Sequence, residues 1–367
     1  MSDQEDFIPQ MRPLFGSEER EELLRYLDED GFFTEYKRTE AFEFEIARYT
    51  GAQHCVVVNN GTVSLTLAAL ALGVGPGDEV IVPNYTMIAT PNSIKLISAK
   101  PVFVDVEPDT LVIDLELVKK AITRRTKAIM LVSANGRAPS AGIQAFEELS
   151  QKTGIPIIED AAQSLGSFYA DGRHIGLAGS IGSLSFSAPK IISTGQGGAL
   201  ITNDANLAEK LRRLKDFGRA TGGTDIHDSI GYNFKFTELQ ACVGLAQMRK
   251  LPDRVKRKKE IWRLYKTGLC NVPNLELFKH DLSLCTPWFI DCLVENRSEL
   301  ITHLNLAGIG TRVMYPPIHH QDAYKATGTF PISLIVGRKG LWLPSMVQLS
   351  DAHIDRVCRE IKNFYKV

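Results

Sequence analysis

The sequence has few of the features that mark secreted, membrane-spanning or metal-binding proteins. Its 367 residues include only 6 cysteines, none of them in a C-x-x-C or zinc-ligand spacing, which indicates reduced thiols. No stretch approaches the roughly eighteen consecutive apolar residues of a membrane helix, and the acidic start at residues 1–6 lacks the apolar core of a signal peptide. We therefore expect a cytoplasmic protein with no membrane segment.

An excess of charge of either sign is also missing. Lys and Arg number 42 against 43 for Asp and Glu, so the formal net charge is −1 and no global field attracts nucleic acid. The one basic run, residues 254–259, has no interleaved aromatic residues, and we interpret it as a solvated helix face. We expect neither a nucleic acid nor a membrane as partner.

Segments with the pattern of strands alternate with segments with the pattern of helices through the first part of the chain. Strands are predicted at 55–58, 79–82, 101–105, 128–132 and 155–158, and helices at 63–72, 91–97, 115–122 and 143–153. This alternation predicts an α/β fold, in which a mainly parallel sheet carries helices on both faces. Ligands of such sheets bind at the carboxyl ends of the strands.

The pattern changes near residue 250. Thr237 to Gln240 has the form of a capping box, and it predicts a helix that runs to about Lys250, where Pro252 interrupts it. A second helix is predicted at 254–269, followed by short strands and helices. We therefore divide the chain into a large domain at 1–250 and, at 251–367, a linker helix with a smaller α+β domain.

Lys190 and Asp160 stand in two distinctive segments. Asp160 ends an apolar run that begins at Ile155, and Lys190 precedes the glycine-rich loop at 194–198. Pyridoxal phosphate needs an amine for a Schiff base and a carboxylate that keeps its pyridine nitrogen protonated. This pair supplies both functions, and it therefore indicates pyridoxal phosphate as the cofactor.

Other polar residues admit both a functional and a structural interpretation. Gly61 and Thr62 open a helix after a strand, which suits a phosphate, although Thr62 could be an ordinary helix cap. The Ser185 hydroxyl could reach the same phosphate or bond the local backbone. His319 and His320 are adjacent in a segment expected to be extended, so at most one faces a given site. No Asp, Glu or Cys near them has a spacing that supports a metal site.

Several motifs together resemble those of one family. They lie at 60–62, 75–83, 103–108, 159–164, 185–190, 195–198, 231–235 and 310–312, with Pro317 and His319 beyond. On these residues the chain resembles the DegT/DnrJ/EryC1/StrS sugar-nucleotide aminotransferases over nearly its whole length. The resemblance implies the type I aminotransferase fold and pyridoxal phosphate. Within the family it is most similar to perosamine-synthase-type enzymes, which aminate C4 of a nucleotide-linked 4-keto-6-deoxyhexose for surface polysaccharide or glycan biosynthesis.

The resemblance also implies roles for individual residues. Lys190 would carry the cofactor and move the proton, Asp160 would protonate the pyridine nitrogen, and Gln163 would bond the ring oxygen. The cofactor phosphate would be held by Gly61, Thr62, the backbone of Val63, Ser185 and, from a second subunit, Asn233. The protein would thus be a homodimer with shared active sites. The residues near the sugar nucleotide would be Arg312, Tyr315 and His319, and glutamate would be the amino donor.

The chain departs from the family pattern at two places. Met87 stands where an aromatic residue usually stacks on the cofactor, and residues 133–137 replace a His-aromatic-Gly sequence. Arg137 could contact the substrate or face water. The alternatives are a C3 aminotransferase, a sugar dehydratase and a non-catalytic regulator, but related dehydratases have His where this chain has Lys190.

Overall fold

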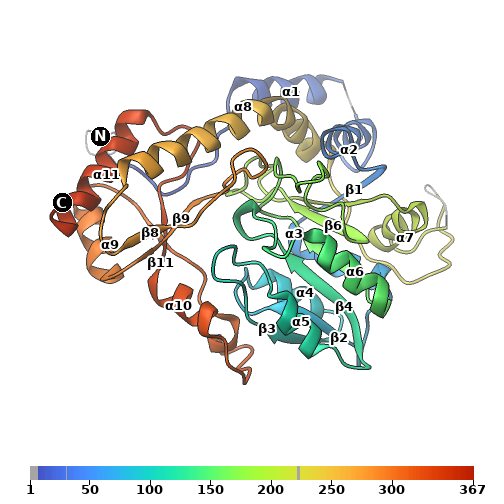
Figure 1. Cartoon of the computed structure of the whole chain (residues 1–367). Coiled ribbons are helices and arrows are strands. Elements are labelled where there is room, and N and C mark those ends of the chain that lie inside the picture. The colour runs from blue at the N-terminus through green and yellow to red at the C-terminus, as the bar shows by residue number, and fades with distance from the viewer. Residues whose placement is uncertain (1–6, 30, 221–223) are drawn as a thin grey trace.

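The computed structural model describes residues 7–29, 31–220 and 224–367, so the acidic start at residues 1–6 lies outside the described residues. A large α/β unit and a smaller carboxyl-terminal unit lie side by side and are joined by one long helix (Figure 1). The large unit is built on a seven-stranded sheet with the strand order β1-β7-β6-β5-β4-β2-β3. These strands are β1 (His54–Val58), β2 (Glu79–Pro83), β3 (Lys100–Val104), β4 (Thr126–Val132), β5 (Ile157–Asp160), β6 (Ile181–Ser185) and β7 (Gly198–Thr202).

The sheet is mainly parallel, as the sequence predicts. Strands β3, β2, β4, β5 and β6 pair in parallel, and β7 pairs antiparallel with both β6 and β1. The carboxyl ends of β5 and β6, where Asp160 and Ser185 stand, therefore meet at one edge. Strands β6 and β7 were not predicted from the sequence. In β6, Gly182 weakens the strand pattern, because glycine is uncommon in strands. At Gly182 in β6, an added Cβ would lie 2.1 Å from the carbonyl oxygen of Gly176, so only glycine fits.

Helices cover both faces of this sheet. Side chains of neighbouring positions alternate between two apolar cores, with Val57 and Ile81 in one core and Val56 and Val80 in the other. The first core is covered by α2 (Lys37–Thr50), α5 (Leu115–Ala121) and α6 (Ile143–Thr153), and the second by α3 (Gly61–Ala71), α4 (Ala89–Lys95) and α7 (Ala205–Lys215). Burial on both faces explains the continuous apolar runs at 55–58 in β1, 80–83 in β2 and 128–132 in β4.

The predicted break at Pro252 is wrong. Helix α8 (Glu238–Gly268) is continuous through this proline and packs against α1 (Ser17–Asp28) and α2. A proline inside a helix costs about 3 kcal/mol. Burial of Leu251 in the main core opposes this cost, as do the hydrogen bonds of the Arg254 guanidinium to the carbonyl oxygens of Leu14 and Ile191.

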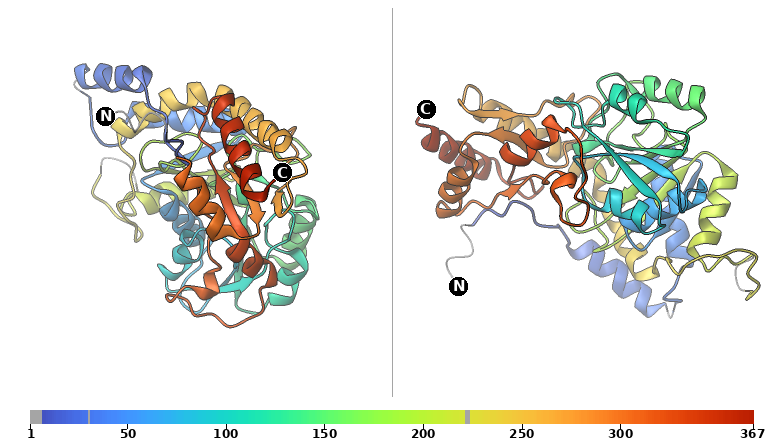
Figure 2. Two further views of the ribbon diagram at one scale, coloured as in Figure 1. Left: turned by 90° about the vertical axis from the view of Figure 1, so that its left-hand side faces the viewer. Right: turned by 90° about the horizontal axis from the view of Figure 1, so that it is seen from below.

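The carboxyl-terminal unit carries an antiparallel sheet with the order β10-β11-β9-β8 and lies to one side of the large unit (Figure 2). Its elements are β8 (Leu275–Leu277), β9 (Ile290–Val294), α9 (Arg297–Leu306), β10 (Arg312–Val313), α10 (Pro331–Lys339), β11 (Gly340–Leu343) and α11 (Asp351–Tyr365). Ile8, from the other end of the chain, packs in its core. We propose that the boundary between the two domains lies at residue 250, inside helix α8, which joins the two units.

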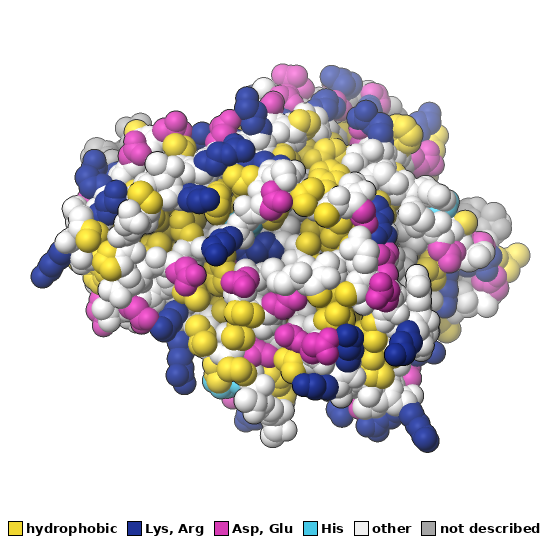
Figure 3. Space-filling model, viewed as in Figure 1, with side chains coloured by type: hydrophobic (Ala, Val, Ile, Leu, Met, Phe, Trp, Pro, Cys, Tyr) yellow, Lys and Arg dark blue, Asp and Glu magenta, His cyan; other side chains and the backbone are white. Residues whose placement is uncertain are grey.

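A separate apolar cluster fills the seam between the two units. Tyr85 and Ala134 of the large unit contact Trp288, Phe289 and Trp342 of the small one. On the face shown in Figure 3, acidic and basic side chains are interspersed, which agrees with the balanced composition. Within the described residues, no helix has the length and apolar character that crossing a bilayer requires.

Candidate active site

A cavity of ≈ 690 Å³ opens at the carboxyl ends of the parallel strands. It collects side chains from the end of β5, the end of β6, the start of α3 and the segment between β2 and α4. Of the predicted site residues, it is lined by Gly61, Thr62, Val63, Met87, Asp160, Gln163, Ser185 and Lys190. Residues more than a hundred positions apart in the sequence thus share one cavity.

The amino terminus of α3 forms one end of this cavity. Its cap is Asn60, whose Oδ1 accepts a 2.9 Å hydrogen bond from the Val63 N–H, so the interpretation of Thr62 as the cap is wrong. The N–H groups of Gly61 and Thr62 have no acceptor among the residues that the structure describes. Two open donors at the positive end of a helix fit a phosphate, whereas the Val63 N–H is already bonded.

Close packing around Gly61 shapes the same corner. An added Cβ at Gly61 would lie 3.0 Å from the Ser185 hydroxyl, and one at Gly198 would lie 2.6 Å from the Asn60 carbonyl oxygen. The Ser185 hydroxyl therefore stands directly beside the open N–H groups. Among the described residues its hydrogen-bond partner is Ser187, through long contacts of 3.3 and 3.5 Å, which leave the hydroxyl available to a bound phosphate.

Asp160 is buried at the end of β5. Its Oδ2 accepts a 2.8 Å hydrogen bond from the Thr90 hydroxyl, which in turn lies 2.8 Å from the Thr86 hydroxyl. Burial raises the pKa of Asp160, while the Thr90 hydrogen bond and the charge of Lys190 oppose this rise. A buried carboxylate of this kind is suited to a cationic partner such as a protonated pyridine nitrogen.

Lys190 follows a tight turn in which its N–H donates to the Ser187 carbonyl oxygen. Its Nζ lies 4.3 Å from the centre of the Trp288 ring. Burial lowers the pKa of Lys190 to about 8; Asp160 acts against this shift, and Arg312 adds to it. A lysine amine that is partly neutral near pH 8 can act as nucleophile and as proton carrier.

Met87 and Gln163 line the cavity together with the amino terminus of α3, Asp160 and Lys190. The Met87 side chain is 43% exposed, and its sulfur accepts a 3.0 Å contact from the Ala89 N–H. An exposed thioether on a cavity wall can pack on a planar ring, in place of the aromatic residue usual at this position. The Gln163 Oε1 accepts a 2.6 Å hydrogen bond from the Asn135 N–H.

The remaining predicted residues lie outside this cavity. Asn233 is exposed, forms an isolated antiparallel bridge with Asp216 and does not line the cavity of Lys190. Arg312 is exposed above the Trp342 ring, and it is near enough to lower the pKa of Lys190. Tyr315 packs edge-on against Trp342, at 4.8 Å between ring centres.

Two expectations on single residues need correction. Residues 318–320 form a 3-10 turn, so the His319 and His320 rings lie 4.2 Å apart and do not point to opposite sides. His319 also exchanges hydrogen bonds with the Asn84 amide. Arg137 neither lines the cavity nor faces water, because it is buried in a 2.8 Å ion pair with Asp291.

Sequence reasoning missed several residues that contact the predicted site. Thr90 bonds Asp160, Trp288 covers Lys190, and Asn135 bonds Gln163. Of these residues only Asn135 had a sequence signal, since it lies in the segment 133–137 that departs from the family pattern. Trp288 comes from the distant carboxyl-terminal unit, which no local pattern connects to Lys190.

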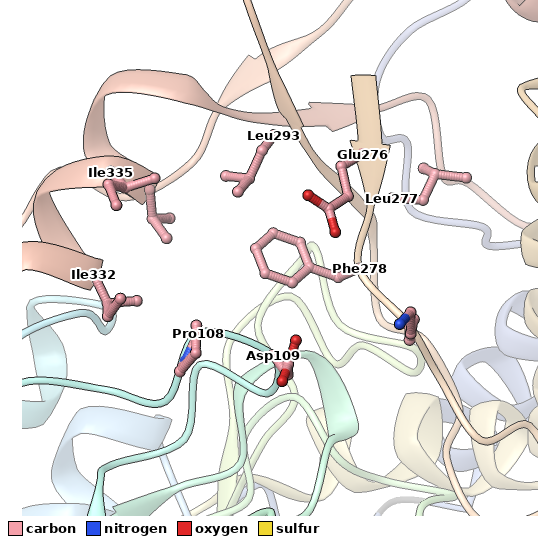
Figure 4. A pocket seen from close by; sticks show the side chains of 10 residues that line it. Pro108, Asp109, Glu276, Leu277, Phe278, Leu293, Ile332 and Ile335 are labelled. Carbon is pink, nitrogen blue, oxygen red and sulfur yellow. The ribbon is translucent and has the colours of Figure 1, made fainter. Parts of the chain in front are cut away.

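A second cavity of ≈ 190 Å³ lies in the seam between the units (Figure 4). Its walls include Phe278, Leu293 and Ile332, and the carboxylates of Asp109 and Glu276 stand at its rim. Because these two acids are exposed, whereas Asp160 is buried beside Lys190, the larger cavity is the better candidate for catalysis.

The larger cavity fits pyridoxal phosphate. It offers an amine, a buried carboxylate, two open N–H groups at a helix terminus and an apolar wall, all within one enclosure. The class of protein that this fold and site define is therefore a pyridoxal-phosphate enzyme with an aminotransferase-type α/β fold.

Comparisons with known proteins agree with this class. The sequence matches the DegT/DnrJ/EryC1/StrS aminotransferase family over residues 15–362. It is 35% identical to the GDP-perosamine synthase of Escherichia coli O157:H7, over 98% of this chain and 99% of the relative. It is 32% identical to the GDP-perosamine synthase of Vibrio cholerae, again over 98% of this chain and 99% of the relative. The solved structure of DesV from S. venezuelae is 34% identical and superposes with a TM-score of 0.90, over 96% of this chain and 95% of that one.

The chain belongs to the DegT/DnrJ/EryC1/StrS aminotransferase family. It is accordingly an enzyme, a sugar aminotransferase that uses pyridoxal phosphate, and the predicted fold class and cofactor are confirmed.

Proposed function

We propose that this enzyme transfers the amino group of glutamate to C4 of a GDP-linked 4-keto-6-deoxyhexose. The observation that carries the proposal is the similarity to two GDP-perosamine synthases along 98% of the chain. The intact pair of Lys190 and Asp160 at one cavity supports turnover. GDP as the nucleotide and C4 as the position come from the relatives' names.

The residues of the cavity suggest how the reaction proceeds. Pyridoxal phosphate, when bound, supplies an electron sink for the carbon that loses or gains a proton. Asp160 would keep the pyridine nitrogen protonated, and Gln163 would donate to the ring oxygen. Gly61, Thr62 and Ser185 would hold the phosphate. The Lys190 amine would first attach the cofactor, then be displaced by glutamate, and finally carry the proton between the donor carbon and the cofactor.

We also propose a homodimer with shared active sites. Large apolar side chains are exposed on and between α1 and α2, namely Leu24, Leu27, Phe32, Phe33, Tyr36 and Phe44. Others are exposed on the segment around Asn233, namely Phe217, Ile226, Ile230 and Tyr232. Exposed apolar groups of this number favour an interface with another copy. Asn233 would then serve the partner's phosphate site.

The substrate proposal can be tested with a panel of nucleotide sugars. The purified enzyme, loaded with pyridoxal phosphate, is incubated with glutamate and with 4-keto-6-deoxyhexoses linked to GDP, UDP or dTDP, and a 3-keto sugar is included. Mass spectrometry and NMR identify the product and the position of its amine. We expect amination at C4 of the GDP sugar together with release of 2-oxoglutarate.

Other outcomes point to the alternatives. Amination only of the 3-keto sugar would favour a C3 aminotransferase, and loss of a hydroxyl without a new amine would favour a dehydratase. The Lys190→Ala variant is the matched control, and it should fold but give no multiple turnover. Failure of the wild-type enzyme with every sugar, despite bound cofactor, would favour a non-catalytic regulator.

A further inference from the structure

Asn135 occupies an unusual place at the end of β4. It is buried in the short turn Ala134–Gly136, within the segment that departs from the family pattern. Its backbone is left-handed, with φ 55° and ψ 29°. Such a conformation costs a side-chain-bearing residue roughly 1 kcal/mol, and asparagine tolerates it better than most. A buried asparagine held this way indicates that its surroundings determine its position.

The Asn135 side chain clamps the backbone of Phe289. Its Oδ1 accepts a 2.7 Å hydrogen bond from the Phe289 N–H, and its Nδ2 donates at 2.8 Å to the Phe289 carbonyl oxygen. Both bonds are buried, and rotating the amide by half a turn would set donor against donor. The clamp therefore fixes the start of the carboxyl-terminal unit's β9 segment against the end of β4.

Phe289 is the neighbour of Trp288, which covers Lys190. The two rings stack with their centres 3.8 Å apart. The Trp288 indole N–H donates a 2.7 Å hydrogen bond to the Pro189 carbonyl oxygen, directly before Lys190. Trp288 is buried, and its ring face lies 4.3 Å from the Lys190 Nζ. The clamp on Phe289 thus determines where the indole meets the amine.

The other side of Asn135 is anchored in the active site. Its N–H donates to the Gln163 Oε1 at 2.6 Å, and Gln163 lines the same cavity as Lys190. Gly136 allows the close approach, because an added Cβ there would lie 2.6 Å from the Ser167 hydroxyl and 2.8 Å from the Thr286 carbonyl oxygen. Asn135 thereby connects the cofactor cavity with the aromatic pair of the other unit.

We propose that Asn135 is a positioning residue, whose side-chain amide holds Trp288 against Lys190 and so keeps water from the side of the reactive amine that faces away from the cavity. The proposal depends on Lys190 as the reactive amine but not on the identity of the sugar. Lys190 is half-buried and lines the cavity, so removing the clamp should admit water to the amine from the Trp288 side as well. The charged groups that act on this amine, Asp160 on β5 and Arg312 on β10, are left in place by the test below.

The test measures the reactivity of Lys190 in the cofactor-free protein. The rate at which an acylating reagent modifies Lys190 is followed by peptide mass spectrometry from pH 6 to pH 11. The wild-type midpoint should lie near the lowered pKa of about 8. In Asn135→Gly, which keeps the left-handed backbone and its N–H, the midpoint should rise by about one unit or more toward the ordinary lysine value of about 10.4.

Matched variants separate a positioning role from a general loss of stability. Asn271 also has a positive φ, of 60°, but is exposed and does not line the cavity of Lys190, so Asn271→Gly should leave the midpoint near 8. Trp288→Leu should raise the midpoint. The double variant with Trp288→Leu and Asn135→Gly should have the same midpoint as Trp288→Leu alone, because Asn135 acts through Trp288. If Asn135→Gly does not fold, Asn135→Ala removes the same two side-chain hydrogen bonds without adding a charge and should give the same shift.

The outcome that overturns the proposal is clear. A folded Asn135→Gly or Asn135→Ala protein with an unchanged midpoint, beside a shifted Trp288→Leu protein, would show that Trp288 is held without Asn135. A double variant whose midpoint shift equals the sum of the two single shifts would also show that Trp288 is held without Asn135. Because no sugar nucleotide is used, neither result depends on the proposed substrate.

Discussion

The Thr90 hydroxyl donates a 2.8 Å hydrogen bond to Oδ2 of Asp160, inside the protein and beside the cavity that holds Lys190. This bond lowers the pKa of a carboxyl group that burial otherwise raises. Thr90 stands at the beginning of α4, so one hydroxyl connects that helix to the proposed counter-ion of the cofactor.

Thr90→Val should therefore weaken cofactor binding. The substitution keeps the shape of the side chain but removes a hydrogen bond to a charged group, worth about 1.5–3 kcal/mol. We expect a roughly 10- to 100-fold higher Kd for pyridoxal phosphate in absorbance titrations. Thr90→Ser retains the hydroxyl and should bind nearly as the wild type does. Equal affinity of Thr90→Val and wild type would remove this bond from the site.

Lys190→Met should stabilise the cofactor-free protein most at low pH. The pKa of Lys190 is about 8 in the folded state, and an unfolded lysine titrates near about 10.4. The folded state thus binds fewer protons between these values, so the wild type gains stability as pH rises through this window. In urea unfolding, the free energy of unfolding of Lys190→Met should exceed that of the wild type most below pH 8, and the difference should decrease toward about pH 10.4. Lys256→Met, on the exposed face of α8, is the control, and its difference from the wild type should not decrease in this way.

Arg137→Met should destabilise the fold more than a surface substitution does. It leaves the Asp291 carboxylate buried without its ion-pair partner, which typically costs about 3–5 kcal/mol. Denaturant unfolding measures this loss. Arg137→Met combined with Asp291→Leu removes both charges and should recover much of it. A single variant as stable as wild type would mean that the pair contributes little to the seam.

Mixing two inactive variants should restore activity if the active sites are shared. Lys190→Ala and Asn233→Asp homodimers should each be inactive. A heterodimer would contain one site with both lesions and one site with neither, so transamination should reappear on subunit exchange. Exchange must be verified independently, with differently tagged subunits. Continued inactivity of verified heterodimers would place Asn233 in the site of its own subunit.

Arg312→Ala should impair the sugar half reaction more than the glutamate half reaction. Arg312 is exposed at the small unit and acts electrostatically on Lys190, and its planar donor fork suits a diphosphate. Single-turnover kinetics, started from the amine form of the cofactor, measure the sugar half alone. His319→Ala is the companion variant, and its effect should be smaller because His319 is bonded to Asn84. Normal sugar rates in both variants would place the substrate site elsewhere.

The sequence predicted those parts of the molecule that depend on local pattern. The first five strands were found because apolar runs of strand length alternate with helical segments, and Asp160 and Lys190 were found because each stands in a distinctive local segment. Strand β6 was not predicted, because Gly182 weakens the strand pattern, although tertiary packing requires a glycine there.

Contacts between distant segments could not be predicted in the same way. The approach of Trp288 to Lys190 depends on the placement of one unit against the other, and the continuity of α8 depends on neighbours that bury Leu251. The ion pair of Arg137 shows the same limit, because its partner Asp291 is 154 positions away.

The docking of Ile8 has a consequence for how the chain is made. The Ile8 N–H donates to the Gly308 carbonyl oxygen, and the Gly310 N–H donates to the Ile8 carbonyl oxygen, both at 2.8 Å. Ile8 leaves the ribosome well before the surface that buries it, which is synthesised some three hundred residues later. During translation this apolar side chain therefore lacks its packing partners until the carboxyl-terminal unit has been made, so the folding of that unit also fixes a segment that was synthesised long before it.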